Sequence, residues 1–72
     1  MALDLYVNGE PRRLDQSPVS ANLLSVIQAL GHNPQLVVTE HNGVIVPRSQ
    51  WPNIPVGDYD SLEIVTIVGG GS

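Results

Sequence analysis

The sequence predicts an α+β fold in which a mixed sheet of about five strands packs on one main helix. Two Asn-Gly pairs, Asn8-Gly9 and Asn42-Gly43, each separate two short runs with the composition of strands, and this dipeptide is the strongest short-range signal for a hairpin. One stretch with the apolar spacing of a helix lies between the two hairpins. A final apolar run, residues 61–68, supplies the fifth strand.

The first hairpin is predicted over residues 3–14. Apolar side chains alternate with more polar ones in residues 3–7, as a half-buried strand requires. Asn8 and Gly9 both tolerate the positive φ of a type I′ turn. The return strand contains Pro11, which cannot donate a hydrogen bond to a neighbouring strand, so it is predicted to lie at the edge of the sheet.

A helix of roughly three turns is predicted next. Its apolar stripe consists of Leu23, Leu24, Ile27 and Leu30. Ser20 is the predicted N-cap, Gly31 lies just past the C-terminal end, and Pro34 prevents the helix from resuming. Such a helix can also bind a partner, but a single stripe is better explained as the face that covers the sheet.

The second hairpin is predicted to join residues 36–39 to residues 44–46, and Pro47 ends its second strand. Residues 48–55 hold Trp51 among polar residues and two prolines. This composition indicates an ordered crossover loop or a single helical turn. Trp51 is interpreted as a packing anchor at the edge of the core.

The last strand follows a turn at Gly57 and Asp58. The order of strands and helix is that of a β-grasp sheet, whose first and last strands are parallel neighbours at the centre. Parallel neighbours need a long crossover, and the helix-containing middle of the chain supplies it.

The last strand is apolar on both faces. Leu62 and Ile64 point to one side, and Val65 and Ile67 point to the other. A single helix covers only one face of the sheet. Val65 and Ile67, with Tyr6, therefore form either an exposed docking patch or a surface covered by a loop.

Composition excludes several classes of function. With a formal charge of −4, three arginines and no lysine, the chain is a poor partner for nucleic acid or an anionic membrane. Without cysteine it has no disulfide, thiolate metal site or cysteine nucleophile. His32 and His41 lack the spacing of metal ligands and are interpreted as loop or strand-end residues, so no metal site is predicted. No nucleophile–base pair is recognisable, which disfavours an enzyme. The lack of a long apolar segment or a basic signal start predicts a cytoplasmic protein.

A glycine-rich tail, residues 69–72, follows a predicted domain of residues 1–68. It consists of Gly69, Gly70, Gly71 and Ser72. Glycine has no Cβ and reaches φ values closed to other residues, so this tail can enter a narrow cleft of a partner enzyme with its carboxylate first. The same composition is also that of a frayed end or a flexible linker.

Several motifs stand in an order and spacing that resemble a known family. They are Val7-Asn8-Gly9, residues 42–48 with Trp51 close behind, Gly57-Asp58, and the run from Leu62 into the glycine tail. Together they are similar to the ThiS family of thiamine-biosynthesis sulfur carriers. The resemblance implies a ubiquitin-like β-grasp protein that is a carrier and cosubstrate, with the catalytic groups on its partners. The family pattern ends on glycine, whereas this chain ends on Ser72.

The resemblance also implies a chemistry. An adenylyltransferase of the ubiquitin-activating type would use ATP and magnesium to activate the carboxylate of Gly71, if Ser72 is absent or removed. A persulfide donor, a cysteine desulfurase, would supply the sulfur, and thiazole synthase would take it from the resulting thiocarboxylate. The chain itself would bind no cofactor. Gly69 and Gly70 would let the tail pass into the partner's cleft.

A docking surface on the body follows from the same resemblance. Its residues would be Val65, Ile67, Tyr6, Asp58 and Glu63. The apolar members would make the contact, while the carboxylates, together with Asp60, would meet a basic rim on the partners. Arg48 is interpreted as a surface ion-pair residue, with a binding role as the alternative.

Two further functions stay open at this point. The small subunit of molybdopterin synthase is a closely similar β-grasp carrier with the same glycine tail, although the lack of phenylalanine here favours the thiamine pathway. A ubiquitin-like interaction module whose tail is never activated is the other. Ser72 itself is a trimmed residue, an expression remnant or a genuine end.

Overall fold

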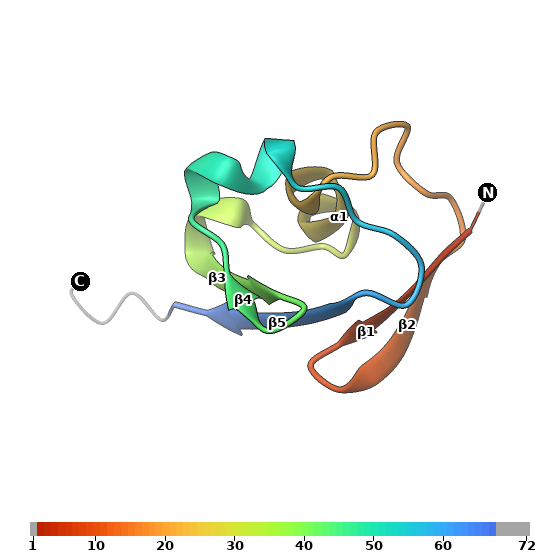
Figure 1. Cartoon of the computed structure of the whole chain (residues 1–72), viewed down its shortest axis with the longest axis horizontal. Coiled ribbons are helices and arrows are strands. Elements are labelled where there is room, and N and C mark those ends of the chain that lie inside the picture. The colour runs from red at the N-terminus through yellow and green to blue at the C-terminus, as the bar shows by residue number, and fades with distance from the viewer. Residues whose placement is uncertain (1, 68–72) are drawn as a thin grey trace.

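A five-stranded mixed sheet with one helix on one of its faces forms the body of the protein (Figure 1). The computed structural model describes residues 2–67. The strands are β1 (Leu3–Val7), β2 (Glu10–Leu14), β3 (Val37–His41), β4 (Val44–Ile45) and β5 (Ser61–Thr66). The helix is α1 (Leu23–Ala29), and two 3-10 helices, η1 (Pro34–Leu36) and η2 (Arg48–Asn53), complete the chain. This is the predicted α+β, β-grasp arrangement.

The strand order is β2-β1-β5-β3-β4, so β5 lies at the centre and β2 at one edge, as predicted. β1 and β5 are parallel, with Tyr6 opposite Ser61 and Val7 opposite Leu62. β3 and β5 are antiparallel over five residue pairs. The strand that leads into the glycine tail is therefore held on both sides.

Both Asn-Gly turns form as predicted, because Asn8, Gly9, Asn42 and Gly43 have φ values of 53°, 81°, 50° and 86°. The two asparagine side chains also reach β5. Asn8 Nδ2 donates to the Ile64 carbonyl at 3.1 Å, and the Ile64 N–H donates to Asn8 Oδ1 at 2.7 Å. On the other side of β5, the Ser61 N–H donates to Asn42 Oδ1 at 2.8 Å. Each turn thus fastens its hairpin to the central strand.

The predicted N-cap of the helix, Ser20, is wrong. Asn22 is the N-cap, and its Oδ1 accepts the Ser25 N–H at 2.9 Å while Ser25 Oγ accepts the Asn22 N–H at 3.1 Å. The chain at the start of the helix is tied to the segment around Pro55 by a bridge between Asn22 and Pro55 and by the Val56 N–H on the Ala21 carbonyl. The helix therefore begins later and is shorter than predicted.

The C-terminal end of α1 follows the prediction. Gly31 has a φ of 91°, and its N–H donates to the Gln28 carbonyl at 3.0 Å. Pro34 does not extend the helix but starts the separate turn η1.

The core lies between α1, η2 and the sheet. Its buried apolar residues are Leu3, Leu5, Val7, Leu23, Val26, Ile27, Val37, Val46, Trp51, Val56, Leu62 and Ile64. Trp51 is a packing anchor as predicted, but it lies inside the core and not at its edge, with only 1% of its surface exposed. Its Nε1–H donates to the Val46 carbonyl at 2.9 Å. Val46 follows β4, donates its N–H to the Thr39 carbonyl at 3.2 Å and has a buried side chain.

Candidate functional site

The sheet face that α1 leaves uncovered carries a set of exposed apolar side chains. Val65 on β5 is 57% exposed, Val38 on β3 is 47% exposed, and Ile45 on β4 is 72% exposed. Val38 lies opposite Val65, and Ile45 lies opposite Glu40, so register places all of them on one face. Of the two alternatives, an exposed patch and a surface covered by a loop, the described residues show the first, because Val65 and Ile67 are both exposed.

These residues line a shallow groove of about 250 Å³, called the outer groove below. Its lining residues are Val38, Thr39, Glu40, Ile45, Glu63 and Val65. Glu40 and Glu63 lie directly opposite each other on β3 and β5. The groove therefore combines an apolar floor with two neighbouring carboxylates.

The predicted docking residues fall into two groups. Val65 and Glu63 line the outer groove, and Ile67, 46% exposed, follows β5 with its N–H on the Leu36 carbonyl. Tyr6 is opposite Ser61 and thus four residues from Val65, roughly 13 Å along the strand. The structure does not bring Tyr6 into contact range of the outer groove.

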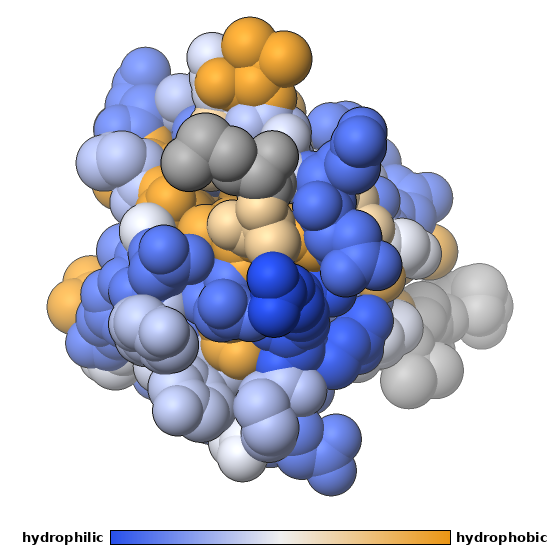
Figure 2. Space-filling view, turned by 90° about the vertical axis from the view of Figure 1, so that its right-hand side faces the viewer, coloured by the Kyte–Doolittle hydropathy of each residue, from blue (hydrophilic) through white to orange (hydrophobic). Residues whose placement is uncertain are grey.

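Tyr6 belongs to a second hollow, which it lines with Pro11, Arg13 and Tyr59 among others. Asp58 lies close by, and its Oδ1 accepts the Asp4 N–H at 3.1 Å. Figure 2 shows the end of the molecule that lies away from the C-terminal end of β5, where hydrophilic side chains form much of the surface and apolar ones lie in separate places. The outer groove therefore stands apart from this more polar end.

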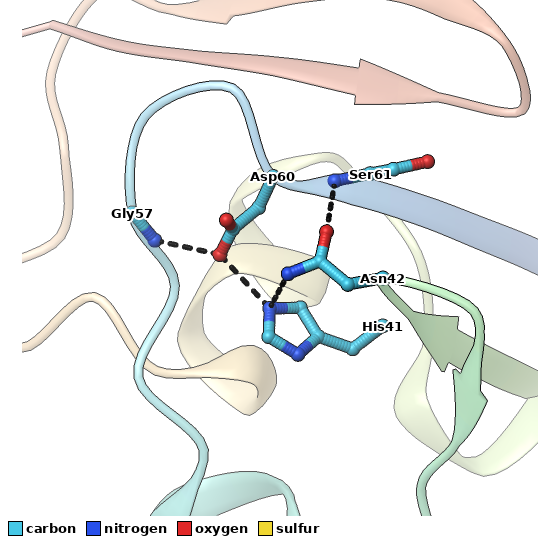
Figure 3. Close-up of polar contacts among 5 residues, drawn as sticks. All are labelled: His41, Asn42, Gly57, Asp60 and Ser61. Atoms are coloured by element: carbon cyan, nitrogen blue, oxygen red, sulfur yellow. Dashed lines mark hydrogen bonds and ion pairs between the residues drawn. The ribbon is translucent and has the colours of Figure 1, made fainter.

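Asp60 holds a turn through its side chain (Figure 3). Its Oδ2 lies 2.9 Å from His41 Nε2 and accepts the Gly57 N–H at 2.9 Å. Burial would raise the pKa of the Asp60 carboxyl, but the Gly57 N–H and the side chains of His41 and Asn42 outweigh it and hold that pKa below its ordinary value. This geometry gives Asp60 a structural role, and its part in an acidic docking rim stays a prediction.

Replacing Asp60 with asparagine is expected to weaken the loss of stability in acid. Since the folded pKa is the lower one, the carboxylate stabilises the fold above the ordinary value of 3.8, and this contribution is lost as the pH falls through the folded value. Urea unfolding between about pH 5 and pH 2 measures it. Asn replacement of the exposed Asp15 is the control; an equal effect of both variants would contradict the assignment.

Arg48 does not form the predicted surface ion pair among the described residues. Its Nε donates to the Pro34 carbonyl at 2.7 Å and its Nη2 to the Val37 carbonyl at 3.3 Å. The guanidinium also lies over the Trp51 ring, 5.6 Å from its centroid. Arg48 thus binds carbonyls at the N-terminal end of β3 and just before it, where the short strand β4 does not pair.

Four lining residues of the outer groove were not predicted as site residues: Val38, Thr39, Glu40 and Ile45. The pattern of residues 36–39 indicated a strand, but nothing local gave its register against β5. The β5 sequence does contain a signal for them. A central strand that is apolar on both faces indicates that the neighbouring strands also carry apolar side chains on the face that the helix leaves uncovered.

The predicted sulfur-carrying residues, Gly69, Gly70 and Gly71, lie outside the described residues, as does Ser72. Within residues 2–67 no three potential metal ligands gather into a group. No helix of this described part has the length and apolarity needed to cross a membrane.

Comparison with known proteins covers nearly the whole chain. The sequence profile of the ThiS family matches residues 5–71. A thiazole synthase from Paramagnetospirillum magneticum is 40% identical over 70 residues, which are 97% of this chain but 21% of that protein. The chain thus spans about a fifth of that relative. An uncharacterised protein, ycf40, from Trieres chinensis is also 40% identical, over 97% of this chain and 92% of its own length.

Solved structures agree with the sequence comparison. The crystal structure of the thiamine biosynthesis protein ThiS from Geobacter metallireducens is similar with a TM-score of 0.77 and 31% identity. The similarity covers 96% of this chain and 100% of that one. The profile match, the shared ubiquitin-like β-grasp fold and the order of the motifs lead to one conclusion. The chain belongs to the ThiS family.

Proposed function

We propose that the chain is a cytoplasmic sulfur-carrier protein of thiamine biosynthesis, whose C-terminal glycine carries sulfur to thiazole synthase as a thiocarboxylate. The observation that carries this proposal is the family match over residues 5–71, which includes the glycine tail together with the folded body. The tail follows directly from the central strand β5. The chain supplies the reacting carboxylate, and its partners supply the catalytic groups.

The chemistry begins with a carboxylate, which is a poor electrophile. A partner adenylyltransferase, using its own ATP and magnesium, would convert the Gly71 carboxylate to an acyl-adenylate and release pyrophosphate. The terminal sulfur of a persulfide on a cysteine desulfurase or a relay protein would attack the acyl carbon and expel AMP. A thiol would then cleave the acyl disulfide and leave the thiocarboxylate.

The comparisons support thiazole synthase as the sulfur acceptor. Two proteins named thiazole synthase, from Paramagnetospirillum magneticum and Magnetococcus marinus, each contain a segment similar to this chain. That segment makes up 21% and 20% of their lengths. A carrier-like segment within the same polypeptide favours a direct encounter between the two activities.

The outer groove supports a docking role for Val65 and Glu63, and Ile67 extends the same surface toward the tail. A contact here would leave Gly69, Gly70 and Gly71 free to enter the partner's cleft. Tyr6 and Asp58 would contribute only to a partner that also covers the far end of the sheet.

Intact mass is the experiment that tests the function. A chain ending at Gly71 is incubated with the adenylyltransferase, ATP, magnesium, a persulfide donor and a thiol, and is expected to exchange one oxygen for sulfur. The form ending at Ser72 is expected to load more slowly, because its acyl carbon is displaced by one residue. Omission of ATP is the control. Transfer of the sulfur to thiazole synthase completes the test, and the absence of any ATP-dependent mass change would refute the proposal.

A further inference from the structure

We propose that the outer groove receives an extended arginine or lysine side chain of thiazole synthase, with its apolar stem on the groove floor and its cationic head between Glu40 and Glu63. The inference rests on the proposed function, since it names the partner contact of the same carrier. It identifies a chemical group on the partner that neither the fold nor the tail specifies.

The pairing of β3 with β5 places two glutamates side by side. Glu40 on β3 and Glu63 on β5 are a directly opposed pair in an antiparallel ladder. Like charges in this position destabilise a sheet. Both side chains lie on the uncovered face and line the same groove. The free protein therefore keeps a repulsive pair that a cation between the two carboxylates would relieve.

The chain provides no such cation in its described part. The sequence contains no lysine. Arg12 and Arg13 lie on β2, separated from β3 by β1 and β5. Arg48 is engaged with the carbonyls of Pro34 and Val37. The ion pairs formed by residues 2–67 involve Asp4, Asp15 and Asp60, and none includes a glutamate.

The groove floor selects the kind of cation. Val38, Ile45 and Val65 are all exposed and lie beside the two carboxylates. A metal ion or a small ammonium would leave this apolar surface in water. Arginine and lysine combine a long methylene stem with a charged head, so one side chain covers the floor and neutralises the pair. Charge complementarity at such a site sets specificity and the rate of encounter.

The test measures stability and binding in the same variants. Glu40→Gln and Glu63→Gln are each expected to raise the melting temperature by about 2–4 °C, because each removes the like-charge pair. Each is also expected to weaken binding to thiazole synthase about tenfold. Titration calorimetry of the full chain measures the affinity. Glu10→Gln, at an exposed position on the edge strand β2, is the matched control and is expected to change neither quantity.

A higher melting temperature together with weaker binding in the same variant would indicate that the two carboxylates repel each other in the free protein and bind a cation of the partner. Unchanged affinity of both variants, with normal sulfur loading, would overturn this inference and leave the proposed function intact. A loss confined to loading by the adenylyltransferase would also overturn it, because the occupant would then come from that enzyme. No binding of the wild-type chain to thiazole synthase would overturn the inference as well, and the loading assay would then show separately whether the carrier function stands.

Discussion

Replacing Trp51 with alanine is expected to lower the free energy of unfolding by about 3–5 kcal/mol. The side chain is 1% exposed and lies among the core residues of α1, η2 and the sheet. The substitution leaves a cavity the size of an indole and removes the Nε1–H that the Val46 carbonyl accepts. Arg48 also loses the ring that it covers. The whole free energy of unfolding of a small domain is only about 5–15 kcal/mol. The variant is therefore expected to be largely unfolded under mild denaturing conditions.

Urea unfolding followed by far-ultraviolet circular dichroism is the suitable measurement, because the sequence contains no other tryptophan to report by fluorescence. Trp51→Phe is the matched control. It keeps an aromatic ring in the core but leaves the Val46 carbonyl without its donor, so a loss of about 1–3 kcal/mol is expected. An alanine variant as stable as the phenylalanine variant would show that the core closes around the missing ring.

Replacing Asn8 with alanine is expected to lower the free energy of unfolding by about 2–4 kcal/mol, although Asn8 is exposed and lies in a turn. Two effects add. The side chain exchanges two hydrogen bonds with the backbone of Ile64, each contributing about 1 kcal/mol. The residue also has a φ of 53°, which alanine tolerates poorly, at a cost of about 1 kcal/mol. Chemical denaturation measures the sum.

Two variants separate these effects. Asn8→Gly accepts the positive φ and loses only the side-chain bonds, so it is expected to recover about 1 kcal/mol relative to alanine. Asn8→Asp keeps the acceptor for the Ile64 N–H but places a carboxylate oxygen against the Ile64 carbonyl. If glycine restored full stability, the bonds to β5 would contribute nothing and the turn alone would explain the residue.

Local signals predicted most of the fold. Asn8-Gly9 and Asn42-Gly43 fix their turns through backbone conformations that few residues adopt, so both hairpins followed from the sequence. The position of β5 beside β1 followed from its apolar faces and from the length of the crossover. The N-cap was missed because the capping box between Asn22 and Ser25 was not recognised; Asn22 also forms a bridge with Pro55, which is distant in sequence. Ser20 and Asn22 are both favoured N-cap residue types, but only Asn22 forms a capping box with Ser25.

In the candidate site, too, local sequence patterns predicted some residues and not those whose position depends on contacts between distant segments. Val65 was predicted because a central strand with two apolar faces exposes one of them. Val38, Glu40 and Ile45 were not, since the pairing of β3 with β5 joins segments about 25 residues apart and a shift of one residue would turn each side chain to the other face. The structural role of Asp60 was not predicted because the sequence gives no sign that His41 and Gly57 meet it in space.

The central place of β5 has a mechanical consequence. A force applied along β5 at its C-terminal end, as the proposed function would require, acts on a strand with a parallel neighbour in β1 and an antiparallel neighbour in β3. The hydrogen bonds of both ladders cross the direction of pull, perpendicular to it in the β3 ladder and slanted in the β1 ladder, so two ladders share the load, whereas an edge strand has only one. The bonds from Asn8 and Asn42 add attachment points on opposite flanks of the same strand. The body therefore acts as a rigid handle that withstands a load on its end.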